Sequence, residues 1–132
     1  MLLKKEVSEI FENELFHQFA TVSKDGVPNI CNVGAKYIRE DGKIIVIDNY
    51  MKKTLWNVLE NPEVSILVRR GKESYQIKGT AVYVSEGKEY EDAHQWMKSV
   101  NDRYPAKGAI VVTVHSVYNS MSGSTAGDKF EE

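Results

Sequence analysis

Hydrophobic and polar residues alternate along most of this chain with the two-residue period of β-strands, and a few helical stripes interrupt the alternation. Near residues 3–14, apolar side chains recur at three- and four-residue steps, which predicts a short amphipathic helix. Two further helical patterns begin near Lys52 and Gly87. Strand-like segments cover residues 19–23, 28–38, 43–48, 63–68, 74–84 and 109–114.

Turn sequences join these segments into hairpins. Gly26 and Gly42 each end a Lys/Glu-Asp-Gly turn, so the first three strands are predicted to form an antiparallel meander. Residues 69–72 connect a second hairpin, and Gly79 in its longer arm indicates a β-bulge. Pro62 is expected to stop the middle helix, because proline disfavours helical geometry in the residue before it.

An open sheet of this size would expose unpaired strand edges, which promote aggregation, so we predict a sheet that closes on itself. The expected fold is mainly β with short helices: a small barrel of six antiparallel strands. The 132 residues and 42% hydrophobic content suit a single domain over residues 1–132 with one core. Residues 119–132 are small and polar and are predicted to form a flexible tail.

The composition of the chain limits the classes of partner that we expect. The net charge of -2 and the pI near 5.9 give no overall basic field, so we expect no nucleic-acid partner. No apolar run approaches the ~20 residues of a membrane span, so no membrane partner is expected. Cys31 is the only cysteine, which excludes an intramolecular disulfide and favours a reducing, cytoplasmic location.

The candidate chemistry lies where the strand at 43–48 leads into a helix. A helix start offers unpaired N–H groups at the positive end of its dipole, and here Lys52, Lys53 and the Thr54 hydroxyl accompany them. This arrangement would hold a phosphate. The alternative interpretation is that both lysines are ordinary solvated charges and that Thr54 caps the helix.

The other reactive side chains give weaker evidence of a functional site. The three histidines are far apart in the predicted elements, so no metal site is expected. Cys31 has no activating neighbour in the sequence and is predicted to be a small buried apolar residue. No nucleophile elbow or dinucleotide-type glycine loop is present in the sequence, and no catalytic side chain is predicted.

The segments 19–28, 44–54 and 57–64, in this order, resemble the FMN-binding split-barrel flavoproteins related to pyridoxamine 5'-phosphate oxidase. Among these, the chain is most similar to the small FMN-binding proteins of anaerobic microbes. The resemblance extends over residues 16–117. Its pattern is a lysine and threonine at the helix start, an asparagine three residues later, and an Asn-Pro-x-Val exit, matched by Lys53, Thr54, Asn57, Asn61, Pro62 and Val64.

The resemblance implies a six-stranded split barrel that forms a homodimer, with one FMN in each of two grooves at the interface. Lys53 and Thr54 would bind the phosphate, Lys52 would add charge, and the Met51 backbone would lie at the turn. The positions that would line the flavin ring and its ribityl chain are Asn32, Val33, Asp48 and Asn49.

The resemblance also places the loop before the last strand of the partner subunit over the flavin. That loop carries Tyr104; Trp96 is a second candidate for the same role. Each aromatic residue also fits a packing role, since Trp96 falls on the apolar stripe of its predicted helix. The tail after Tyr118 is a further candidate for covering the cofactor or the partner.

The expected activity follows from what the chain has and lacks. The family's oxidases continue into an arginine- and tryptophan-rich strand that binds pyridoxal phosphate, whereas residues 129–132 here read Lys-Phe-Glu-Glu, with an acidic end. We therefore expect a flavin-dependent oxidoreductase or electron carrier with a small-molecule or protein electron donor and acceptor. The alternatives are a non-enzymatic barrel that binds flavin, deazaflavin or haem, and a dimeric interaction module without a cofactor.

Overall fold

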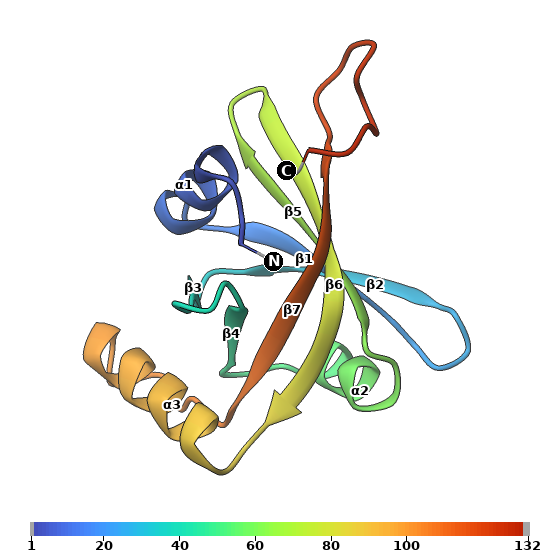
Figure 1. Cartoon of the computed structure of the whole chain (residues 1–132). Helices are drawn as coiled ribbons and strands as arrows, with labels where there is room; N and C mark the ends of the chain where they lie inside the picture. The colour runs from blue at the N-terminus through green and yellow to red at the C-terminus, as the bar shows by residue number, and fades with distance from the viewer. Residues whose placement is uncertain (1, 131–132) are drawn as a thin grey trace.

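A strongly curled antiparallel sheet forms the body of the protein in the computed structural model, which describes residues 2–130 (Figure 1). The strands are β1 (His17–Val22), β2 (Pro28–Val33), β3 (Lys36–Ile38), β4 (Ile44–Asp48), β5 (Glu63–Arg70), β6 (Glu73–Val84) and β7 (Gly108–Asn119). The helices are α1 (Lys5–Asn13), α2 (Lys53–Glu60) and α3 (Lys88–Val100). The predicted mainly β split-barrel class is confirmed.

The strand order explains the curl. Hydrogen-bonded neighbours follow the order β2-β1-β5-β6-β7-β4-β3, so β2 and β3 are the two edges of the sheet. Only Gly34 and Ala35 separate these two strands along the chain. A two-residue link cannot span a flat sheet, so the sheet bends until its edges meet, as a split barrel requires.

This corner is where the structure differs from the predicted meander. Residues 28–38 do not form one strand: β2 pairs with β1, and β3 pairs with β4. The break falls at Gly34 and Ala35, and the Ala35 carbonyl accepts a hydrogen bond from Ile47 N at 2.9 Å. The pattern 28–38 is continuous in hydrophobicity, so it does not reveal the bend. The barrel therefore has seven strands within the described residues where six were predicted.

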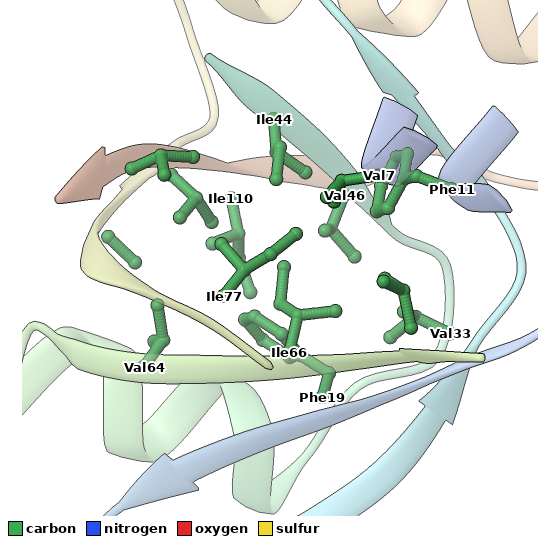
Figure 2. Packing of buried hydrophobic residues seen from close by; sticks show 14 of the residues in the cluster. Val7, Phe11, Phe19, Val33, Ile44, Val46, Val64, Ile66, Ile77 and Ile110 are labelled. Carbon is green, nitrogen blue, oxygen red and sulfur yellow. The ribbon is translucent and has the colours of Figure 1, made fainter. Parts of the chain in front are cut away.

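The apolar run in β4 is continuous because both faces of this strand are buried. Ile44 and Val46 point into the main core with residues of β5, β6, β7 and α1, whereas Ile45 and Ile47 pack with Met97 of α3. Figure 2 shows side chains from the sheet and from α1 converging in the main core. The strand is thus fixed from two sides immediately before the candidate site.

The helices close the open parts of the barrel. α1 packs against β5 and β3, α2 against β1, β2 and β6, and α3 against β4 and β7 (Figure 1). Their positions agree with the helical stripes in the sequence, and α2 ends at Glu60, two residues before Pro62. No helix in the described part of the chain is long and apolar enough to cross a membrane.

Two further predictions can be compared with the structure. The register between β6 and β7 shifts between Lys78 and Gly79, which confirms the predicted bulge. The polar tail turns back on its own barrel: Phe130 N donates to Val117 O at 2.7 Å, and the Phe130 ring stacks on Tyr75 at a centroid distance of 4.6 Å. The last two residues of the predicted tail, 131 and 132, lie outside the described residues.

Candidate functional site

A pocket of about 440 Å³ opens between β2 and the turn that leads from β4 into α2. Segments from both sides of the barrel corner build it, because β2 and β4 are distant along the sheet and close around the curl. Of the predicted site residues, seven line this pocket: Asn32, Val33, Asn49, Met51, Lys52, Lys53 and Thr54. The remaining residues that line the pocket were not predicted: Asn29, Ile30, Cys31, Gly34, Ala35, Ile47 and Tyr50.

The start of α2 supplies positive charge to the pocket. As in α1 and α3, no side-chain hydrogen bond caps the start of α2, but the first turn of α2, unlike theirs, contains no acidic residue. Lys52 and Lys53 are exposed, and neither makes an ion pair with any residue in the part of the chain that the structure describes. The first backbone N–H groups and two free ammonium groups therefore remain available to an anion.

Thr54 is a buried residue of the pocket wall at the start of α2. The side chain is buried, and its hydroxyl oxygen accepts a hydrogen bond from Asn29 Nδ2 at 3.2 Å and lies 3.3 Å from Cys31 Sγ. Asn29 Nδ2 also donates to Thr21 Oγ1 at 3.2 Å, as Asn57 Nδ2 does at 3.0 Å. The network ties α2 to β1 and β2, so the helix start is held in a fixed position over the pocket.

Asn29 and Cys31 belong to the pocket and were missed in the sequence. Both are half-buried, and Cys31 is therefore a pocket residue as well as a partial member of the core. The signal was present: side chains two apart on a strand share a face, so assigning Val33 to the pocket implies Cys31 and Asn29 as well.

The resemblance places both Asp48 and Asn49 against the cofactor, but only Asn49 lines the pocket. Asp48 is fully buried and is not among the residues that line the pocket; its Oδ1 accepts from Met51 N at 2.9 Å and its Oδ2 from the Tyr83 hydroxyl at 2.6 Å. Asn49 lines the pocket, but its Oδ1 accepts from Ala106 N at 2.9 Å. Both side chains hold the backbone around the pocket.

Tyr104 lies beside the pocket rather than in its wall. Its ring makes an edge contact with Tyr50, which does line the pocket, at a centroid distance of 6.3 Å. Trp96 instead packs on Tyr37 at 4.7 Å, next to the cluster beneath α3. Of the two candidate aromatics, the structure therefore brings only Tyr104 near the site, and a role for it across a subunit interface stays a prediction.

A curled antiparallel half-barrel with a pocket at its strand-to-helix corner, lined by Lys52 and Lys53, is typical of a split-barrel protein. Residues 3–121 match the family model described as pyridoxamine 5'-phosphate oxidase. The chain belongs to this family, which confirms the resemblance seen in the sequence.

Similar proteins extend over almost the whole chain. The uncharacterized protein MJ0282 of Methanocaldococcus jannaschii is 40% identical over 128 residues, which cover 95% of this chain and 85% of that protein. The crystal structure of HupZ from Group A Streptococcus is 26% identical, with a TM-score of 0.82, covering 96% of this chain and 100% of HupZ.

More distant structures share the fold and differ in what they bind. An FMN-binding protein from Syntrophomonas wolfei is 17% identical, with a TM-score of 0.76, covering 90% of this chain and 86% of that structure. HutZ, described as the heme storage protein of Vibrio cholerae, is 16% identical, with a TM-score of 0.71, covering 90% and 95%. At these identities the likeness shows a shared fold only. The ligand of this chain depends on the residues of its own pocket.

Proposed function

We propose that this protein is an FMN-binding flavoprotein that acts as an oxidoreductase or electron carrier and works as a homodimer with FMN at the interface. The observation that carries the proposal is the uncapped start of α2, where two unpaired lysines open onto the pocket. The proposed setting is the cytoplasm, and the electron donor and acceptor are a small molecule or another protein.

The residues present fit the chemistry of FMN. The phosphate carries up to two negative charges, which Lys53 and Lys52 would neutralise while the first N–H groups of α2 donate to its oxygens. The pocket volume of about 440 Å³ falls within the ~300–1,000 Å³ typical of small-molecule sites. The edge strand β2, where Asn32 is exposed and Val33 is buried, would lie along the rest of the cofactor.

In this proposal FMN supplies the redox chemistry by accepting and passing on a hydride or electrons. The protein binds and orients it: Lys53 and Lys52 fix one end, Met51 and Thr54 shape the wall, and Tyr50 with Tyr104 shields the rim from water. None of these side chains is required to act as an acid or a base.

The first test compares FMN with riboflavin, which lacks the phosphate. Replacing Lys53 by alanine should weaken FMN binding by about 1.5–3 kcal/mol, or roughly 10- to 150-fold, because a charge-assisted phosphate contact is lost. Riboflavin affinity should stay within about twofold, since surface changes rarely alter stability or packing. Flavin fluorescence quenching on the apoprotein measures both constants.

Lys72→Ala is the matched control, because Lys72 is an equally exposed lysine in the turn between β5 and β6. The proposal fails if the wild-type protein binds FMN no better than riboflavin. It also fails if the protein takes up haem or a deazaflavin in preference, or remains colourless with every one of these ligands.

Anaerobic addition of NADH or NADPH to the FMN-loaded protein then separates a reductase from a passive binder. A reductase loses the visible absorption of its oxidised flavin, whereas a passive binder keeps it.

A further inference from the structure

Asp48 is the only fully buried carboxylate among the described residues. A buried charge is costly unless hydrogen bonds compensate it, so its position calls for a structural or functional reason. It lies at the end of β4, three residues before Met51 and directly ahead of the turn into α2. The carboxylate does not line the pocket and has no lysine or arginine partner among the hydrogen bonds it makes.

Two donors hold the Asp48 carboxylate, and each comes from a different part of the chain. Met51 N donates to Oδ1 at 2.9 Å and closes the turn from which α2 begins. The Tyr83 hydroxyl, from β6, donates to Oδ2 at 2.6 Å. Tyr83 is thereby connected, through one carboxylate, to the backbone that presents Lys52 and Lys53.

The surroundings of Tyr83 are fitted to this contact. Gly108 pairs with Asp48 across β4 and β7, and a Cβ atom at Gly108 would lie 2.1 Å from the Tyr83 hydroxyl oxygen. Only glycine leaves room for the hydroxyl there. Burial and the hydrogen bond to Asp48 raise the pKa of Tyr83, so the phenol stays protonated and can donate at every physiological pH.

We propose that Tyr83 and Asp48 are positioning residues for the anion site: they lock the turn before α2 so that its first N–H groups and Lys53 point at a phosphate. The inference rests on the proposed function and identifies what gives the site its preference for a phosphorylated ligand. Neither side chain touches the ligand.

The test replaces Tyr83 by phenylalanine, which removes the donor and keeps the ring. Affinities for FMN and riboflavin are measured by fluorescence quenching, and stability is measured by thermal unfolding. We expect the ratio of the two affinities to fall about tenfold, because the Asp48 carboxylate loses one of its two donors and the phosphate contacts loosen. Riboflavin, which does not use those contacts, should bind as to the wild type.

Tyr75→Phe is the matched control. Tyr75 lies on the same strand, is buried, and donates to a carboxylate, Glu73, at 2.8 Å, but far from the pocket. It should lose stability without changing the affinity ratio. Asp48→Asn is the second variant, and it keeps an oxygen that can accept from Met51 N. Its ratio of FMN affinity to riboflavin affinity should therefore stay higher than that of the double variant Tyr83→Phe/Asp48→Ala, which keeps no such oxygen.

The outcomes separate the two proposals. A wild type that prefers FMN and a Tyr83→Phe variant with the same preference would overturn the positioning role and leave the proposed function intact. Equal losses for both flavins, or an equal drop in the ratio for Tyr75→Phe, would also overturn it by showing a general effect on folding. A wild type without preference for FMN would instead refute the phosphate site itself.

Discussion

The histidine at the start of β1 is buried in surroundings that disfavour its charged form. His17 is fully buried, its ring stacks on Phe11 at 5.1 Å, and its Nε2 lies 2.9 Å from the Phe11 carbonyl oxygen. A carbonyl only accepts, so Nε2 carries the proton of the neutral ring. Within residues 2–130, Nδ1 has no hydrogen-bond partner, and protonating it would bury an unsatisfied cation.

The free energy of unfolding should therefore fall as the pH is lowered through the ordinary histidine range. Burial lowers the pKa of His17 below its usual 6.5, and nearby Lys36 acts in the same direction while Glu14 opposes it. In the unfolded chain His17 binds a proton near pH 6.5, whereas in the folded protein it does not, and this difference favours unfolding below that pH. Urea unfolding at pH 7.5 and pH 5.5, or roughly one unit either side of that value, measures the loss.

Replacing His17 by glutamine should remove this part of the pH dependence, because glutamine does not titrate and still offers an N–H to Phe11. His115→Gln is the control, since His115 is exposed and its Nε2 lies 2.9 Å from the Thr80 hydroxyl oxygen. An unchanged pH slope in the His17 variant would show that the carboxylates, and not this histidine, set the dependence.

Among single residues, the sequence predicted those that line the pocket better than those that support it. Lys52, Lys53 and Thr54 are adjacent, so their meeting at a helix start follows from local pattern alone. The partnership of Asp48 with Tyr83 joins residues far apart in the chain, and no local pattern contains it. The resemblance placed Asp48 against the cofactor, but in the structure its carboxylate bonds to Met51 N and the Tyr83 hydroxyl and does not line the pocket.

Among the elements, the bulge in β6 places a tight constraint on the sequence. Gly79 sits where the register with β7 shifts, and a Cβ atom there would lie 2.2 Å from the Thr113 carbonyl oxygen. This neighbour is backbone and cannot rotate away. Gly79→Ala should therefore reduce the free energy of unfolding by about 3 kcal/mol or more, as overpacking forces the two longest strands apart.

Lys78→Ala is the matched control for that change. Lys78 is the adjacent residue in the bulge and its side chain is exposed, so truncating it should cost less than about 0.5 kcal/mol. Both values come from urea unfolding at neutral pH. Similar midpoints for the two variants would mean that the strands can separate locally without loss.

Element positions were predictable to the extent that each element is a local pattern. The three helices and the hairpin of β5 and β6 follow from hydrophobic period and turn residues. The corner at Gly34 and Ala35 does not, because the bend arises when β4 pairs with β7 and draws β3 away from β2. That pairing joins residues 60 or more positions apart, and it is also what brings β2 opposite the start of α2.

At the scale of the whole molecule, large apolar side chains remain exposed around the pocket. Ile30 and Tyr50 line it and are 66% and 70% exposed, and Trp56 and Leu59 on α2 are 57% and 62% exposed. Apolar clusters of this kind mark surfaces that bind another molecule, and aromatic residues are enriched at the centres of protein interfaces. A second copy of the chain would cover these residues and close the pocket in one step.

The dimer can be tested by placing a charge on this surface. Trp56→Glu should shift the protein from dimer to monomer in sedimentation equilibrium, because the carboxylate would have to be desolvated in an apolar contact. Val100→Glu is the control: Val100 is similarly exposed at the end of α3, so that variant should stay dimeric. The monomer should also bind FMN about tenfold more weakly, since half of the cover over the pocket is lost. A wild-type monomer that holds FMN tightly would contradict the dimer, and a dimer that survives Trp56→Glu would place its interface on another face of the barrel.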